Sequence, residues 1–139
     1  MTRPLAIIVE DDPKLGAIYE TALQQTGYDT YLDADGNNVM DHLPTVEPAL
    51  IILDAHLPYA TGADLLRQIR SNPRWSKVPI IVATADLFLA KSLQGQAEHV
   101  LLKPVSVGRL LEITNRLLPG AAPEATKNKT NTRPGGKTL

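Results

Sequence analysis

The chain contains no cysteine among its 139 residues. A disulfide framework, a thiolate metal site and a thiol nucleophile are therefore all excluded. The absence of cysteine also agrees with a reducing compartment, where disulfides would not persist. Any reactive side chain has to come from the acids, bases and hydroxyl groups that remain.

Long apolar runs are missing as well. No apolar segment approaches the roughly 18 residues that a membrane-spanning helix requires. The N-terminal residues Met1-Thr2-Arg3-Pro4 lead into a strand-like run that is too short for the apolar region of a signal peptide. We therefore expect a cytoplasmic protein that does not bind a membrane.

An excess of charge of one sign is also absent, since the formal net charge is -1. A dedicated nucleic-acid binder is expected to carry a basic face, so we expect no direct contact with nucleic acid. The chain has no internal repeats. Its length and its 43% hydrophobic content are sufficient for one domain with a buried core.

Short runs of branched apolar residues alternate with helical patterns along the chain. The runs predict strands over residues 5–9, 28–32, 50–54, 80–83 and 99–102. The helical patterns lie at 13–27, around 39–43, from the 58–62 loop to 71, at 87–93 and at 107–118. This alternation predicts an α/β fold, a doubly wound parallel sheet with helices on both faces and right-handed crossovers.

The boundaries follow from the same pattern. The strand over 28–32 is the most polar and is expected at an edge of the sheet. Asp12 is a plausible N-cap for the first helix, which would bury Leu15, Ile18 and Ala22, with Tyr19 as a further candidate. We expect one domain over residues 1–118 and a disordered tail over 119–139, whose Gly, Pro, Thr, Asn and Lys content cannot build a core.

Reactive side chains occur where the predicted strands end. The first strand is followed by Asp11 and Asp12, the third ends on Asp54, the fourth on Thr84, and the fifth is followed by Lys103. Because the carboxyl ends of parallel strands lie along one edge of the sheet, these five side chains are expected to converge. Each position alone has an ordinary structural explanation, such as an N-cap for Asp12 or β-propensity for Thr84.

Three carboxylates, a hydroxyl and an ammonium group in one cleft favour phosphoryl chemistry. Crowded carboxylates raise the pKa of at least one of them unless a cation lies between them. Hard oxygen ligands suit Mg²⁺, which completes its shell with waters and substrate phosphate. Asp54 is then a candidate nucleophile that forms an aspartyl phosphate, while Lys103 neutralises charge and Thr84 donates a hydrogen bond.

The chain resembles the receiver domain of bacterial two-component response regulators, the CheY-like fold. The resemblance covers residues 5–118 and depends on four motifs in order: Val9-Glu10-Asp11-Asp12, the Asp54–Gly62 segment, Thr84-Ala85 and Lys103-Pro104. It implies a flavodoxin-like five-stranded sheet of order 2-1-3-4-5. It also implies that a sensor histidine kinase or a histidine phosphotransfer protein phosphorylates Asp54, and that a downstream protein target responds.

The resemblance further implies the ligands of the metal. Asp12, Asp54 and the backbone carbonyl of His56 would bind Mg²⁺, with Asp11 contributing through a water. The sequence departs from the family at Val100, where an aromatic residue usually couples phosphorylation to output. His56 and Asp86, two residues after Asp54 and Thr84, stand at positions that tune hydrolysis of the phosphoaspartate, and we expect them to set its lifetime.

Three interpretations of the chain stay open. The first is a stand-alone receiver, a monomer or weak homodimer that signals through a protein surface, because no DNA-binding helix pattern follows residue 118. The second is a pseudo-receiver that binds proteins without phosphorylation, which Val100 favours. The third is a small nucleotide- or flavin-binding protein, but acids stand where a glycine-rich phosphate loop would be needed.

The remaining aromatic residues and the histidines have simpler explanations. Trp75 and Tyr59 are expected to pack against the core and not to stack on a ligand. The histidines are far apart on different elements and show no metal-ligand spacing, so they are interpreted as ordinary surface or loop residues: His42, His56 and His99.

Overall fold

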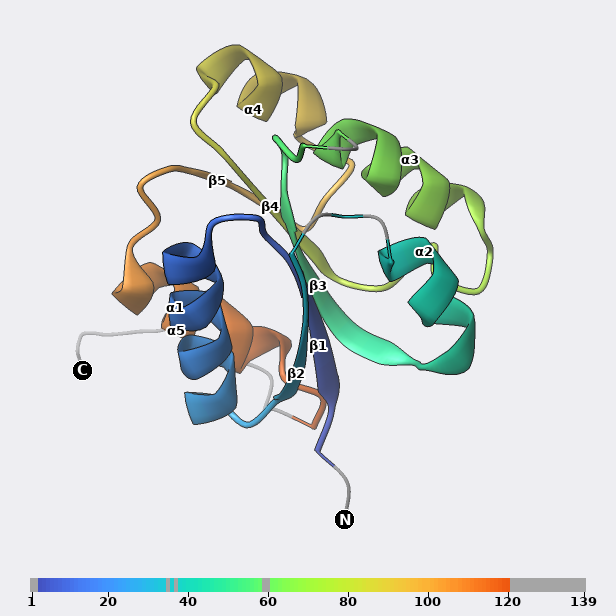
Figure 1. Cartoon of the computed structure of the whole chain (residues 1–139), viewed down its shortest axis with the longest axis vertical. Helices are drawn as coiled ribbons and strands as arrows, with labels where there is room; N and C mark the ends of the chain where they lie inside the picture. The colour runs from blue at the N-terminus through green and yellow to red at the C-terminus, as the bar shows by residue number, and fades with distance from the viewer. Residues whose placement is uncertain (1–2, 35, 37, 59–60, 121–139) are drawn as a thin grey trace, which may run out of the picture.

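The structure is a computed structural model that describes residues 3–34, 36, 38–58 and 61–120 (Figure 1). In these residues strands and helices alternate from one end to the other. They are β1 (Leu5–Val9), α1 (Pro13–Gln25), β2 (Asp29–Asp33), α2 (Val39–His42), a 3-10 turn (Leu43–Thr45), β3 (Pro48–Asp54), α3 (Gly62–Ser71), β4 (Ile80–Thr84), α4 (Leu87–Leu93), β5 (His99–Leu102) and α5 (Val107–Leu117).

The described strands form one five-stranded sheet in the order β2-β1-β3-β4-β5, and every neighbouring pair is parallel. The predicted fold class and strand order are therefore confirmed. β2 lies at an edge, as its polar sequence indicated, whereas β1, β3 and β4 are buried strands at the centre of the sheet. β3 begins two residues earlier than predicted, at Pro48, and β2 is shifted by one residue.

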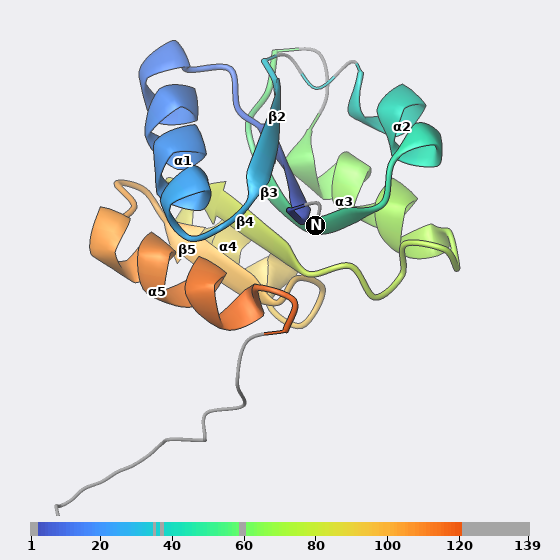
Figure 2. The ribbon, with the colours of Figure 1, turned by 90° about the horizontal axis from the view of Figure 1, so that it is seen from below.

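Helices cover both faces of the sheet, and each face has its own core. α1 and α5 lie side by side on one face, whereas α2, α3 and α4 cover the other (Figure 2). Alternate residues of β1 serve the two cores, since Ile7 and Val9 pack with α3 while Ala6 and Ile8 pack with α1. Because both faces of each central strand are buried, a shift in register would misplace its apolar side chains. The burial therefore fixes the residue at which each central strand ends.

α1 begins as predicted, but one of the residues expected to be buried on it is exposed. The Asp12 side chain accepts hydrogen bonds from the backbone N–H groups of Lys14 and Leu15, so its prediction as N-cap is confirmed. The prediction that Ile18 is buried is wrong, because that side chain is 42% exposed. The burial of Ala22 is confirmed, as is that of the further candidate Tyr19, which is 3% exposed.

Two further predictions concern the periphery. Trp75 is buried against the α2–α3–α4 core, as predicted. Tyr59, the side chain of His42 and most of the predicted tail, residues 121–139, lie outside the described residues. Among the helices that are described, none has the length and apolar character needed to cross a membrane.

Candidate functional site

Four strand ends bring reactive side chains together at one edge of the sheet. Asp54 is the last residue of β3 and Thr84 the last residue of β4. Glu10 directly follows β1, and Lys103 directly follows β5. Asp54, Thr84 and Glu10 are almost fully buried. Such burial is unusual for the carboxylates of Asp54 and Glu10 unless they are paired.

Lys103 pairs with two of these carboxylates. Its Nζ lies 3.1 Å from Asp54 Oδ1 and 3.3 Å from Glu10 Oε1. Partial burial lowers the pKa of Lys103, but the hydrogen bond to Asp54 and the charges of Glu10 and Asp54 outweigh it and raise the pKa above its ordinary value. The ammonium group is therefore charged and holds the two carboxylates together. The peptide bond that follows, Lys103-Pro104, is cis.

The acids of this edge form a compact group of oxygen atoms. One carboxylate oxygen from each of Glu10, Asp11 and Asp54 lies within 4.8 Å of the others. Burial, and to a lesser extent the charge of Asp54, raises the pKa of Glu10 to about 7, against the opposing effects of the Asp12 backbone N–H and Lys103. This oxygen-only donor set fits a hard cation such as Mg²⁺.

Asp12 does not lie where the resemblance implied, among the ligands of the metal. Asp12 is exposed, and its Oδ1 accepts the hydrogen bonds that cap α1. It does not belong to the group of three carboxylates, in which Glu10 stands instead. Glu10 is turned inward at the end of β1, where its Oε2 accepts a hydrogen bond from the backbone N–H of Asp12.

Thr84 and His56 face each other beside Asp54. The Thr84 Oγ1 lies 3.3 Å from His56 Nε2, and the His56 backbone N–H donates to Asp54 Oδ1 at 3.2 Å. The Asp86 backbone N–H donates to Thr84 Oγ1 at 3.0 Å. The Asp86 carboxylate is directed elsewhere, since it caps α4 by accepting from the N–H groups of Phe88 and Leu89.

A close backbone approach supports the loop after Asp54. Gly62 donates its N–H to the carbonyl of Ala55, and a Cβ at Gly62 would lie 2.6 Å from both the Asp54 carbonyl oxygen and the Ala55 Cα. Only glycine fits there without displacing the backbone next to Asp54. The sequence placed Gly62 at the end of a loop and of the Asp54–Gly62 motif but did not show this contact, because the contact is between residues from two elements.

Comparison with known proteins identifies the family. A model of the response regulator receiver domain matches residues 6–115. The chain belongs to this family. It therefore carries a receiver domain of the two-component signalling type, whose signal is phosphorylation.

Individual relatives agree with this assignment. The chain is 35% identical to the transcriptional regulatory protein BaeR of Escherichia coli over 123 residues, 84% of this chain and 50% of BaeR. It is 28% identical to the DNA-binding dual master transcriptional regulator RpaA of Synechocystis, covering 98% of this chain and 58% of RpaA. The chain thus spans about half the length of these curated relatives.

Among solved structures, the chemotaxis response regulator CheY4 of Vibrio cholerae superimposes with a TM-score of 0.75 at 25% identity. The match covers 84% of this chain and 100% of CheY4. The five-stranded sheet with helices on both faces is therefore the CheY-like, flavodoxin-like fold.

Proposed function

We propose that Asp54 accepts a phosphoryl group from the phosphohistidine of a sensor histidine kinase or a histidine phosphotransfer protein. The observation that carries this proposal is the contact between the Lys103 ammonium group and the buried Asp54 carboxylate, next to a group of three acids. A structural ion pair explains neither the third acid nor the position of the pair at the carboxyl edge of a parallel sheet, where such folds bind ligands.

The proposed step is a direct displacement at phosphorus. A carboxylate oxygen of Asp54 forms the new O–P bond while the P–N bond to the donor imidazole breaks, and its electron pair returns to the ring nitrogen. Lys103 lies close enough to Asp54 to neutralise the incoming phosphoryl oxygens. Thr84 presents its hydroxyl group on the adjacent strand, where it would donate a hydrogen bond to one of these oxygens.

We assign the metal to Asp11, Asp54 and the backbone carbonyl of His56, with Glu10 contributing in place of Asp12. A Mg²⁺ ion bound there would offset the negative charge that accumulates on phosphoryl and carboxylate oxygens during transfer. The acids themselves supply the arrangement: Asp54 and Glu10 are held by Lys103, and Asp11 completes the group of oxygens. Asp12 remains the N-cap of α1.

His56 is proposed to set the lifetime of the phosphoaspartate. Its exposed ring contacts the Thr84 hydroxyl group beside Asp54, where it would restrict the approach of water to a phosphoryl group on Asp54. Asp86 is not expected to act in the same way, because its carboxylate is engaged in capping α4. The self-catalysed gain and loss of phosphate is the only chemistry that we propose, so the domain acts as a signalling protein and not as an enzyme on external substrates.

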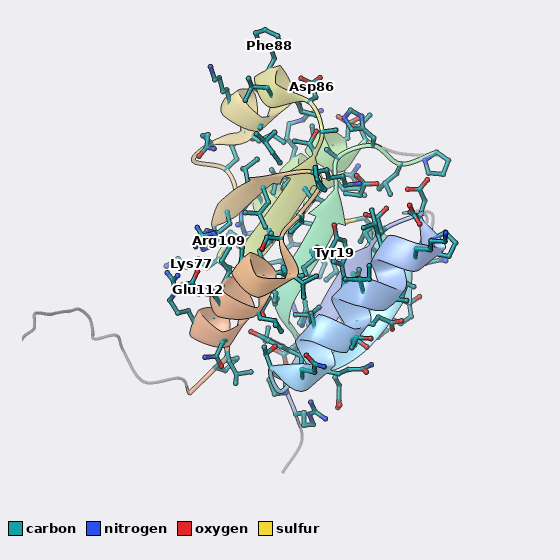
Figure 3. All side chains as sticks on the ribbon, turned by 90° about the vertical axis from the view of Figure 1, so that its left-hand side faces the viewer. Tyr19, Lys77, Asp86, Phe88, Arg109 and Glu112 are labelled. Carbon is teal, nitrogen blue, oxygen red and sulfur yellow. The ribbon has the colours of Figure 1, made fainter. Side chains whose placement is uncertain are left out.

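The output is proposed to pass through a protein surface and not through nucleic acid contacts of this domain. Phe88 at the start of α4 points away from the body of the domain (Figure 3). Its side chain is 82% exposed, and Leu102 on β5 is 47% exposed. Exposed apolar side chains beside the site suit a protein target. We propose a monomer or weak homodimer that is able to act as a stand-alone receiver.

A pseudo-receiver, which binds proteins without phosphorylation, is the second candidate because of Val100. This half-buried valine of β5 pairs with Val82 in the sheet and provides no aromatic ring to respond to Thr84. Intact-mass spectrometry after incubation with acetyl phosphate separates the two functions. The first predicts one added phosphoryl group that depends on Mg²⁺. A mass that stays unmodified both with and without Mg²⁺ would support the pseudo-receiver.

A further inference from the structure

One buried hydroxyl group has no partner among the residues that the structure describes. The Tyr19 Oη atom is inaccessible to solvent and makes no hydrogen bond. A buried hydroxyl group without a hydrogen bond is less stable than one that is paired. Such groups are rare in native proteins and call for an explanation.

Tyr28 provides the contrast within the same core. It is equally buried, yet its hydroxyl group donates a 2.9 Å hydrogen bond to the backbone carbonyl of Thr114. Both tyrosines belong to the core between the sheet, α1 and α5. The core therefore offers partners for a phenol, and the unpaired state of Tyr19 is specific to its position.

Tyr19 lies on a helix that begins next to the functional site. Figure 3 places Tyr19 on the side of α1 that faces the sheet. Long side chains on a helix lean toward its N-terminus, and the N-terminus of α1 directly follows the acids at the end of β1. Burial raises the pKa of Tyr19 to about 12, and the charges that act on it are those of Glu10, Lys103, Asp54 and Asp12.

Glu10 is the neighbouring group with spare capacity to accept a hydrogen bond. Its Oε1 accepts from Lys103 and its Oε2 from the Asp12 backbone N–H. A carboxylate accepts about four hydrogen bonds in total, so a further donor is compatible with both contacts. Glu10 is also 1% exposed and has no access to water that would replace a lost partner.

Phosphorylation would change the partners of Glu10. A phosphoryl group on Asp54 adds negative charge within reach of Lys103 and competes with Glu10 for the ammonium group. Glu10 would then have lost the hydrogen bond that Lys103 donates to its Oε1, which is costly for a buried carboxylate unless another donor replaces it. Among the described residues, Tyr19 is the buried donor without a partner on this side of the site.

We propose that Tyr19 is a positioning residue whose hydroxyl group donates to Glu10 when Lys103 moves toward the phosphoryl group on Asp54. The unpaired hydroxyl group destabilises the unmodified state slightly, and its hydrogen bond stabilises the modified state. Tyr19 would thereby favour the phosphorylated form without touching the phosphoryl group. This inference rests on the proposed function of Asp54.

Tyr19→Phe tests the inference because it removes only the oxygen atom and keeps the packing. The variant is compared with wild type and with Tyr28→Phe in two measurements: the free energy of unfolding without ligand, and the affinity for beryllofluoride in the presence of Mg²⁺. We expect Tyr19→Phe to leave the unliganded stability unchanged or higher and to weaken beryllofluoride binding about fivefold to tenfold, the equivalent of about 1–1.4 kcal/mol. Tyr28→Phe should lower stability and leave the affinity unchanged.

A spectroscopic measurement on the native side chain provides a second test that does not depend on the folding of Tyr19→Phe. The chain has four tyrosines, so ¹³Cζ labelling gives four signals, and Tyr19 is identified by eliminating the others with Tyr28→Phe, Tyr31→Phe and Tyr59→Phe. Beryllofluoride with Mg²⁺ should shift the Tyr19 signal in the direction of a new hydrogen bond and leave that of Tyr28 in place.

The outcomes separate this inference from the proposed function. If wild type binds beryllofluoride but Tyr19→Phe binds it equally well, or the Tyr19 signal does not move, Tyr19 is an ordinary core residue and the inference is overturned. If wild type itself does not bind beryllofluoride, the proposed function fails first and the inference fails with it.

Discussion

The Nζ atom of Lys103 lies 3.1 Å from Oδ1 of Asp54, although the two residues are 49 positions apart in the chain. Two parallel strands, β3 and β5, end at the same level and bring them together with β4 between them. The same ammonium group contacts Glu10 from β1. Lys103 is therefore the only cation in the described part of the chain that pairs with these two buried carboxylates.

Removal of this cation should destabilise the domain when no metal is bound. Lys103→Met leaves Glu10 and Asp54 buried without a counter-charge, and we expect a loss of about 2 kcal/mol, below the value for a fully buried pair because Lys103 is partly exposed. Urea denaturation with and without Mg²⁺ measures this. The loss should shrink in Mg²⁺, since the metal supplies the missing positive charge.

Lys91→Met is the matched control for Lys103→Met, because Lys91 is exposed on α4 and forms no ion pair with the residues that the structure describes. It should change stability by less than about 0.5 kcal/mol in either buffer. An equal effect of the two substitutions, or no response of Lys103→Met to Mg²⁺, would count against the charge balance proposed for the site.

The contact between His56 and Thr84 leads to a prediction about the lifetime of the phosphorylated state. His56→Ala opens the approach of water to Asp54 and should speed dephosphorylation about threefold to tenfold, the equivalent of about 0.7–1.4 kcal/mol in the barrier. The decay of the phosphorylated mass after removal of the phosphodonor measures this rate.

Asp86→Ala is the informative comparison for His56→Ala. It removes the N-cap of α4 and should cost about 1 kcal/mol of stability while leaving the rate of dephosphorylation nearly unchanged. A rate that changes with Asp86→Ala but not with His56→Ala would reverse the roles that we assign to these two residues.

Two glycines at helix starts should respond to alanine in opposite directions. A Cβ at Gly62 would collide with backbone atoms of Asp54 and Ala55, so Gly62→Ala should lower stability by about 1–3 kcal/mol and reduce phosphorylation. A Cβ at Gly108, in the first turn of α5, meets nothing closer than 3.8 Å, so Gly108→Ala should raise stability by about 0.5–1 kcal/mol. Denaturation curves for the two variants measure both effects, and equal losses would refute the steric argument at Gly62.

His99 gives the domain a defined pH response. Burial, and then the positive charges of Arg109 and Arg116, lower the pKa of His99 below its ordinary value of 6.5, against the opposing charge of Glu98. The unfolded chain therefore binds more protons than the folded domain just below pH 6.5, so the contribution of His99 to stability rises with pH through this window and is lost as the pH falls.

His99→Gln should remove this contribution. The difference in the free energy of unfolding between wild type and His99→Gln, measured from about pH 5 to pH 8, should increase toward neutral pH and become constant above it. Taking the difference cancels the other groups, including Glu10, whose raised pKa acts with the opposite sign. A difference that does not change with pH would show that His99 has the same pKa in the folded domain and in the unfolded chain.

The sequence predicted the sheet because its central strands are runs of branched apolar residues bounded by turns. The same runs located Asp54, Thr84 and Lys103, since a parallel sheet brings its strand ends together. The same reasoning could not decide which of the three consecutive acids after β1, residues 10–12, point into the site. Glu10, which belongs to the group of three carboxylates, was not chosen. It directly follows β1, and the direction of the strand, not the residue type, decides that its side chain is buried.

Two expectations on and beside α1 have physical explanations as well. Asp12 was expected both to cap α1 and to bind the metal; its capping hydrogen bonds are present, whereas the group of three carboxylates contains Glu10 in its place. On α1, Ile18 and Tyr19 are adjacent, and hydrophobicity alone favours isoleucine. The inward spacing of Tyr19, Ala22 and Leu23 selects tyrosine instead, with consequences for the site that only the fold reveals.

The most direct test of the central claim is the mass of the intact protein after incubation with acetyl phosphate and Mg²⁺, compared for wild type, Asp54→Asn and Asp86→Asn. We predict one added phosphoryl group on wild type and on Asp86→Asn, none on Asp54→Asn, and none on any of them when Mg²⁺ is chelated. A phosphoryl group that persists on Asp54→Asn, or that never appears on wild type, would contradict Asp54 as the acceptor.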